Sequence, residues 1–137
     1  MMRLAIVLRF YMNVVGLGND IVQTSRIARL ALGRLGPRFA RRVLHPIHEL
    51  PRYTADERGV RLLASTWAAK EAMFKSLSAQ EQTKCVFKNW YRCTDQGRRT
   101  IRDDDYMKRH PSEDFLLTIS HDGEYTTAVV LRLQSSH

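Results

Sequence analysis

Cysteine is scarce in this 137-residue chain, which contains only Cys85 and Cys93. The two do not have the spacing of a zinc or redox motif. The histidines His45 and His48 flank Pro46, which breaks the helix that would carry both rings on one face. We therefore expect no zinc site and two free thiols in a reducing compartment, with a single disulfide between them as the alternative.

Long hydrophobic runs are missing as well. No stretch without charged residues approaches the about 20 residues that cross a bilayer as a helix, so no membrane-spanning helix is expected. Hydrophobic residues make up 44% of the chain and charged residues 26%, as in ordinary globular proteins. A chain of this length forms one domain whose core needs no disulfide.

We place that domain at residues 13–137 and treat residues 1–12 as an N-terminal extension. The extension carries Arg3 and Arg9 among apolar residues and has no acid. This composition is compatible with a short organellar targeting segment, although serine is not enriched, and equally with an extension of the first strand.

Acidic residues are nearly absent from the first third of the chain. From Met1 to His48 there are eight arginines, no lysine and one carboxylate, Asp20, whereas the remaining residues are nearly balanced. The resulting net charge of +8 indicates an acidic partner, which could be nucleic acid, an anionic membrane, a phosphorylated small molecule or an acidic protein. Of these four, we expect no membrane partner. The lone Asp20 is interpreted either as a helix cap or salt-bridge partner of Arg26, or as a metal ligand.

The hydrophobic pattern predicts an α+β fold. A short buried strand at 14–17 is followed by a glycine-loosened turn, with Asp20 at or just past the strand end. A helix capped by Thr24 or Ser25 should run to about Leu32. Its apolar side is expected to be Ile27, Leu30 and Ala31.

A capping box at 54–57 predicts the start of the longest helix, roughly 55–77. Two hairpins should follow, one turning at 95–97 and one turning at 121–124. The charged segment 102–111 between them is expected to be an exposed connection. One strand, then helices, then several strands is the order of an α+β fold rather than of alternating α/β.

The long helix carries a charged pair in an apolar setting. Glu71 and Lys75 lie one turn apart, and the preceding residues 62–69 are small or apolar, unlike a solvated helix face. Asp20 and Glu71 could supply oxygen ligands to a hard divalent cation from two separate elements. Taken alone, these residues make a metal–phosphate site possible, and an ordinary surface ion pair remains the alternative.

Four segments resemble the holo-acyl-carrier-protein synthases, the small type of 4′-phosphopantetheinyl transferase. The first signature is Gly-Leu-Gly-Asn-Asp-Ile-Val at 16–22 with Arg26 and Ile27, and the second is Trp-Ala-Ala-Lys-Glu-Ala-Met-Phe-Lys at 67–75. A weaker strand–turn pattern covers 87–97, and the Ser-His pair ends the segment 117–121. The resemblance covers nearly the whole chain from Val14 in matching order.

The resemblance implies an enzyme with the phosphopantetheinyl transferase fold, a small antiparallel sheet packed on a long catalytic helix. Members transfer the 4′-phosphopantetheine arm of coenzyme A to a serine of apo acyl carrier protein and release adenosine 3′,5′-bisphosphate. By the resemblance, Asp20 and Glu71 hold Mg²⁺, Glu71 takes the serine proton, and Lys75 assists the leaving phosphate.

Further residues are assigned by position. Lys70, Lys75, Ser120 and His121 are expected to bind coenzyme A, although Lys70 could instead only cover the helix. Arg26 matches a docking position for the acidic acyl carrier protein, and Arg29 is its neighbour by helical geometry.

The resemblance also implies a homotrimer with active sites between subunits, acting in fatty acid biosynthesis. The arginine-rich start favours a mitochondrial location, with the cytoplasm as the alternative.

The chain departs from the family pattern in two places near the second signature. Ser65-Thr66 stands where the family often has glycine-arginine, so a contact to the 3′-phosphate or adenine end of coenzyme A is either lost or supplied elsewhere. Ser78 stands where a glycine usually follows the catalytic helix. Neither change affects the expected metal ligands.

Two other functions compete with transfer. A small basic nucleic-acid-binding protein would account for the charge, but the sequence has no recognisable binding motif and no interleaved aromatics, so no nucleic-acid partner is expected. An inactive relative that binds acyl carrier protein or coenzyme A is disfavoured because candidates for every catalytic role are present.

Overall fold

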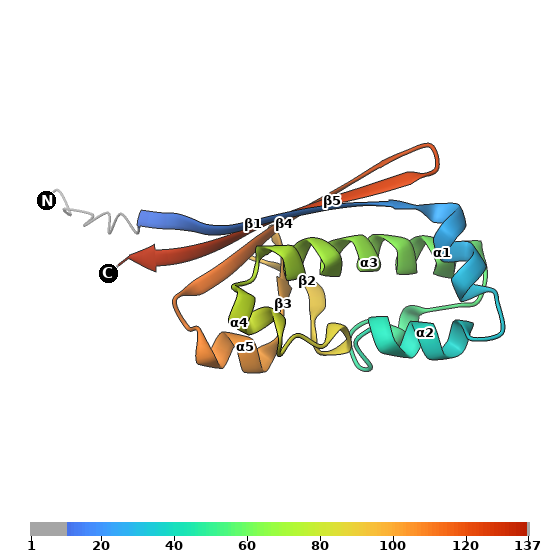
Figure 1. Ribbon diagram of the computed structural model, residues 1–137, viewed down its shortest axis with the longest axis horizontal. Coiled ribbons are helices and arrows are strands. Elements are labelled where there is room, and N and C mark those ends of the chain that lie inside the picture. Colours follow the sequence, from blue (N-terminus) through green and yellow to red (C-terminus); the bar gives the residue numbers. More distant parts are fainter. Residues whose placement is uncertain (1–10, 137) are drawn as a thin grey trace, which may run out of the picture.

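The computed structural model describes residues 11–136 and has an α+β fold, as predicted (Figure 1). Of the expected N-terminal extension, only Tyr11 and Met12 are described, and both belong to the first strand. The elements in chain order are β1 (Tyr11–Gln23), α1 (Thr24–Ala31), α2 (Gly36–Val43), the 3-10 helix η1 (Leu50–Arg52), α3 (Glu57–Ser76), α4 (Ala79–Gln82), the 3-10 helix η2 (Phe87–Asn89), β2 (Tyr91–Asp95), β3 (Arg98–Arg102), α5 (Asp104–Arg109), β4 (Glu113–Asp122) and β5 (Tyr125–Ser136).

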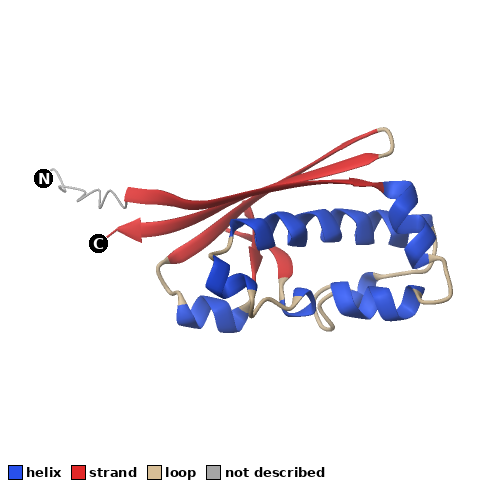
Figure 2. Cartoon of the chain, in the orientation of Figure 1, coloured by secondary structure: helices blue, strands red, loops and turns tan. Residues whose placement is uncertain are grey.

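The strands form two antiparallel sheets. β5 lies between β1 and β4 in a three-stranded sheet, and β2 pairs with β3 as a separate hairpin. The helices lie on one side of the three-stranded sheet (Figure 2), and α3 packs directly against β1 and β5. Within the described part of the chain, no helix is long and apolar enough to cross a membrane.

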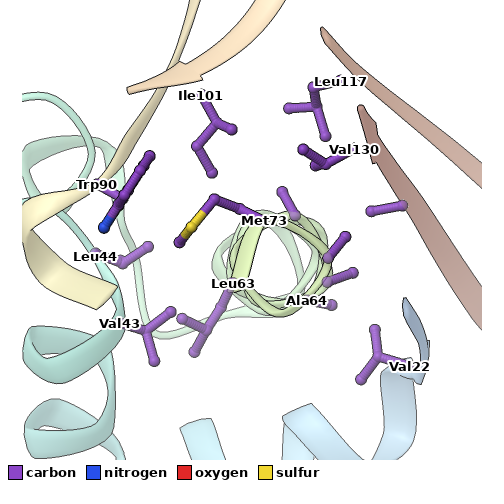
Figure 3. Packing of buried hydrophobic residues seen from close by; sticks show 14 of the residues in the cluster. Val22, Val43, Leu44, Leu63, Ala64, Met73, Trp90, Ile101, Leu117 and Val130 are labelled. Atoms are coloured by element: carbon purple, nitrogen blue, oxygen red, sulfur yellow. The ribbon is translucent and has the colours of Figure 1, made fainter. Parts of the chain in front are cut away.

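The core surrounds α3. Figure 3 looks along this helix, with Leu117 and Val130 approaching from the three-stranded sheet and Trp90 from the segment before β2. Leu63 and Met73 of α3 are fully buried in this cluster. Each such side chain contributes about 1.5–3 kcal/mol on burial, so α3 is fixed from several sides.

β1 differs from its prediction. It is a 13-residue strand rather than a short one, and Gly16 and Gly18 lie within it rather than in a turn. Asp20 consequently lies inside the strand, paired with Ala128 of β5, and not past its end.

The helices show three further corrections, two in α1 and one at the start of α3. Gln23 is the N-cap of α1 and makes no side-chain cap bond, so the caps predicted at Thr24 or Ser25 are wrong. Leu30 is 45% exposed because α1 covers the core with only two residues, Ile27 and Ala31.

The capping box at 54–57 is also absent. Asp56 caps α3 by accepting a hydrogen bond from the Gly59 amide, while the Thr54 hydroxyl donates to the Asp56 carboxylate. The helix therefore begins two residues later than expected.

The later part of the chain is mostly as predicted. Both hairpins are confirmed, with longer strands in the second. The segment 102–111 contains α5, a helix the sequence reading missed, which Asp103 caps through the amides of Asp105 and Tyr106. Tyr106 of α5 is buried against Trp90, so this connection is part of the core.

A candidate active site between the first strand and the long helix

Two glycines let β1 lie against the end of α3. A Cβ at Gly18 would lie 1.8 Å from the carbonyl oxygen of Ala72, and one at Gly16 would lie 2.0 Å from that of Ser76. No side chain fits either space, so the Gly-x-Gly spacing of the first signature is a requirement for close backbone approach. Two residues further along β1, the carboxylate of Asp20 reaches the charged residues of α3.

Lys75 connects the two elements. Its ammonium donates to the carbonyl oxygen of Asn19 at 3.0 Å and to the carboxylate of Asp20 at 3.2 Å. The Asp20 side chain is 16% exposed and that of Lys75 is 49% exposed, so the pair opens to solvent on the lysine side.

Glu71 lies one turn before Lys75 and is half-buried. Burial raises the pKa of the Glu71 carboxyl, the negative charge of Asp20 raises it further, and Lys75 and Arg26 oppose both effects. Among residues 11–136 no hydrogen bond to the Glu71 side chain is found. The structure thus brings the carboxylates of Asp20 and Glu71 near the positive charges of Lys75 and Arg26. Of the two carboxylates, that of Glu71 is left available to a ligand.

The donor set fits a magnesium ion. Asp20 and Glu71 are hard oxygen donors whose mutual repulsion a divalent cation would relieve. Within the described residues no group of three or more metal-ligating side chains is found, so these two carboxylates stand alone. Mg²⁺ is commonly bound in this way, by one or two carboxylates together with water and substrate phosphates.

The Ser-His pair lies on the opposite edge of the sheet. Ser120 and His121 are on β4, which β5 separates from β1. His121 contacts the hydroxyl of Thr126 at 3.0 Å and lines a hollow of about 710 Å³ that also includes Ser25 of α1. The structure therefore does not bring Ser120 and His121 to the Asp20–Glu71 cluster of the same chain.

Lys70 is not available to a cofactor. Its side chain is fully buried and its ammonium donates to the Val43 carbonyl at 2.5 Å and to the Glu49 carboxylate at 2.6 Å. Burial lowers the pKa of Lys70, and Glu49 opposes that effect. The predicted contact between Lys70 and coenzyme A is wrong because this residue faces the interior, on the side of α3 away from β1.

The predicted docking arginines are exposed on α1. Arg26 is close enough to the cluster for its charge to lower the pKa of Glu71. Arg29 follows one turn later and has no such influence on that group. A positively charged helix surface thus begins at the carboxylate cluster and leads away from it.

One positioning residue was missed by the sequence reading. Arg132 of β5 donates to the carbonyl oxygens of Ser76 and Val15 at 2.8 and 2.9 Å, and it forms an ion pair with Glu113. It thereby ties the end of α3 to β1 and β4. No motif marks it, because its partners come from three distant parts of the sequence.

Known proteins share the sequence signatures and the fold. Residues 16–130 match the family described as the 4′-phosphopantetheinyl transferase superfamily. The holo-acyl-carrier-protein synthase of Nitratidesulfovibrio vulgaris is 50% identical over 64 residues, which cover 47% of this chain and 49% of that protein. The chain thus matches about half the length of that relative.

Two other similarities extend over most of the chain. The holo-acyl-carrier-protein synthase of Hydrogenovibrio crunogenus is 32% identical over 123 residues, covering 86% of this chain and 95% of that protein. The crystal structure of the Bacillus anthracis holo-acyl-carrier-protein synthase in complex with coenzyme A (3′,5′-ADP) superposes with a TM-score of 0.68 and 25% identity. That superposition covers 92% of this chain and all of the other.

Proposed function

The chain belongs to the 4′-phosphopantetheinyl transferase superfamily, and we propose on this basis that it transfers 4′-phosphopantetheine from coenzyme A to a serine of apo acyl carrier protein. The products are holo acyl carrier protein and adenosine 3′,5′-bisphosphate. The observation that carries the proposal is the cluster of Asp20, Glu71 and Lys75, which the glycines of β1 hold against α3. A relative with the same fold is a synthase in complex with coenzyme A.

Asp20 and Glu71 would hold Mg²⁺. When bound, the ion neutralises charge on the pyrophosphate oxygens and aligns them for displacement. The fit rests on two adjacent oxygen donors that repel each other when no cation is present.

Glu71 is positioned to take the proton of the attacking serine. Its side chain makes no hydrogen bond within residues 11–136, and its pKa is raised by burial and by Asp20. A raised pKa makes a carboxylate a better proton acceptor, provided that it is ionised at the working pH.

Lys75 supports the leaving group. Its ammonium is fixed by the Asn19 carbonyl and the Asp20 carboxylate, yet half of the side chain is exposed. A compact, positioned ammonium can stabilise the charge that develops on the departing phosphate.

The acyl carrier protein would dock on α1. This helix presents Arg26 beside the cluster and Arg29 one turn further on, a surface that suits an acidic partner. Charge pairs of this kind mainly increase the rate of encounter and fix the register, and they weaken with salt.

We further propose a homotrimer with sites between subunits. The sheet face opposite α3 exposes apolar side chains, with Leu17 and Ile21 each 62% accessible and Val14 60%. Burial of such a patch would stabilise association. His121 and Asp20 lie on opposite edge strands, so a neighbouring subunit could bring the Ser-His pair of one chain to the carboxylates of another. Sedimentation should give a trimer mass, and a single species of monomer mass would contradict this.

The direct test is the mass of the carrier. The protein is incubated with coenzyme A, Mg²⁺ and apo acyl carrier protein, and the carrier is weighed by intact-mass spectrometry. A gain of one phosphopantetheine group that requires Mg²⁺ and is lost with EDTA supports the proposal. No gain with both mitochondrial and bacterial carriers would reject it.

A further inference from the structure

A β-bulge interrupts β1 just before its second glycine signature residue, Gly18. The register with β5 passes from Val14 opposite Leu133 directly to Gly16 opposite Arg132. Val15 is therefore one residue more than β5 pairs with, which is what defines a bulge. From the bulge to the end of β1 the pairing is regular, so the bulge sets the register of everything that follows it.

The bulge decides which face of the sheet Asp20 occupies. Successive side chains of a strand point to opposite faces, so one extra residue exchanges the faces of all residues beyond it. Before the bulge the exposed side chains are the even-numbered Met12 and Val14. After it they are the odd-numbered Leu17 and Ile21. A strand that kept the earlier alternation would turn Asp20 to the exposed face, away from α3.

Arg132 holds this bulge. It is the β5 residue opposite Gly16, and its Nη2 donates to the carbonyl oxygen of the extra residue, Val15, at 2.9 Å. Its Nε donates to the carbonyl oxygen of Ser76 at 2.8 Å. Ser76 is the last residue of α3, whose carbonyl has no acceptor role within the helix itself. One side chain thus joins the bulge of β1 to the end of α3.

Glu113 fixes the orientation of Arg132. Its carboxylate pairs with the Nη1 of Arg132, and its other oxygen accepts a hydrogen bond from the Tyr106 hydroxyl. The side chains of Arg132 and Glu113 are only 12% and 7% exposed. Three nitrogens of a planar, rigid group therefore each have a fixed partner, a geometry that arginine provides and lysine does not.

We propose that Arg132, oriented by Glu113, is a positioning residue for the transfer reaction. By holding the bulge at Val15, it keeps Asp20 on the face of β1 that meets α3, within reach of Lys75. The inference rests on the proposed function, because Arg132 and Glu113 act through Asp20, an expected ligand of the metal ion. Their contribution is the register of the strand and not contact with the substrate.

The test variant replaces both members of the ion pair. Arg132→Met with Glu113→Gln leaves no buried carboxylate without a partner, and the Tyr106 hydroxyl can still donate to the amide oxygen at position 113. A second variant, Arg132→Lys, keeps the charge beside Glu113 but not the three fixed donors. The matched control, Glu81→Gln with Arg109→Met, removes an arginine–glutamate pair that joins α4 to α5 and lies outside β1 and α3.

The first measurement needs no substrate. Amide hydrogen exchange of the full chain, followed by mass spectrometry, should be about tenfold or more faster in segment 11–23 of the test variant, and near wild type in the middle of α3. Arg132→Lys should show a smaller change of the same kind, and the control variant none in this segment. Unchanged exchange in segment 11–23 of the test variant would overturn the proposal. Equal acceleration in α3 would do so as well, because it reports a general loss of stability.

The second measurement asks whether the pair acts through Asp20. Replacements that act through one group do not add, so the test variant should slow transfer about tenfold when Asp20 is present and less than about twofold when Asp20→Asn is already in place. Arg132→Lys should give an intermediate loss, and the control variant should leave the rate unchanged in both backgrounds. An equal loss in both backgrounds would overturn the positioning role.

The two measurements separate this inference from the proposed function. If the wild type transfers no phosphopantetheine, the proposed function fails, and the exchange rates still decide whether Arg132 holds β1 in register. If the wild type transfers and the test variant transfers at the same rate, the positioning role alone is overturned.

Discussion

Lys70 and Glu71 are consecutive residues of α3, yet they belong to opposite kinds of environment. Lys70 is completely buried and paired with the equally buried Glu49. Glu71 is half-exposed, repelled by Asp20 and without a hydrogen bond in the described chain. Because Glu49 and Glu71 are both glutamates, the comparison shows that residue type alone does not separate a structural charge from a candidate catalytic one. What decides is whether a charge is satisfied within the fold or left for a ligand.

The largest effect should come from replacing Glu71. Glu71→Gln removes the proton acceptor and one expected metal ligand while keeping the size and shape of the side chain, so we expect transfer to fall about 10²–10⁴-fold with the fold intact. Carrier mass against time measures the rate. The control is Asp105→Asn, which neutralises an exposed carboxylate on α5. If Glu71→Gln transferred at the wild-type rate, the contrast between the two residues would have no functional meaning.

The next largest effect concerns stability and falls on Lys70. Lys70→Met leaves Glu49 buried without its ammonium partner, which should lower the free energy of unfolding by about 3–5 kcal/mol in urea titrations. Replacing both members, by adding Glu49→Leu, should give a protein more stable than the single variant.

The transfer activity of the same Lys70→Met variant tests whether Lys70 has a structural role alone. The transfer rate per folded molecule should stay near wild type, since Lys70 is remote from solvent. If folded Lys70→Met protein lost as much transfer activity as Glu71→Gln, Lys70 would have a role in the reaction and the contrast would be wrong.

Gly18→Ala tests how the cluster is assembled. The added Cβ would overlap the Ala72 carbonyl, forcing β1 away from α3 and costing about 1–3 kcal/mol of stability as well as activity. Gly97→Ala is the matched control, because Gly97 has φ +77° in the β2–β3 turn with open space around it. Its backbone strain costs a similar ~1–2 kcal/mol without disturbing the site. Equal activity in the two variants would show that the close approach does not matter for catalysis.

The sequence predicted those features that depend on neighbouring residues. The hairpin at 95–97 follows from Gln96 and Gly97, whose positive φ values of 50° and 77° form the tight turn that such sequences favour. The placement of Glu71 and Lys75 one turn apart on one helix is equally local. The scarcity of acids in the first third of the chain marks Asp20, and the family signatures then assign it to the same site as Glu71, which helical or strand periodicity alone cannot do.

The sequence could not predict features that depend on distant contacts. Gly16 and Gly18 looked like turn residues because the helix that excludes their Cβ atoms lies more than 50 residues away. Lys70 looked like a phosphate ligand because its buried acceptor, Glu49, belongs to an irregular loop. Likewise, nothing local indicates that Arg92 of β2 donates to Thr66 of α3.

A smaller effect is expected at the docking surface. Arg26→Gln should raise the KM for acyl carrier protein several-fold with a smaller change in kcat, and it should reduce the dependence of KM on salt. Arg29→Gln should do the same more weakly, since Arg29 lies further from the cluster. An Arg26→Gln enzyme with unchanged KM at low salt would contradict this assignment.

The smallest effect returns to Glu71 and concerns stability against pH in the presence of EDTA. Burial, followed by the charge of Asp20, raises the pKa of Glu71 above its ordinary value of 4.5, so the folded state holds this proton more tightly than the unfolded state does. The free energy of unfolding therefore falls as pH rises from about 4.5 through the folded pKa, and the deficit persists at neutral pH.

Glu71→Gln lacks this ionisation, so the variant should be slightly more stable than wild type at pH 7 and equal to it near pH 3. The difference at pH 7 should be no more than about 1 kcal/mol, because water screens half-exposed charges. Urea titrations at both pH values measure the difference. A Glu71→Gln protein less stable than wild type at pH 7 would mean that Glu71, like Lys70, contributes to holding the fold together.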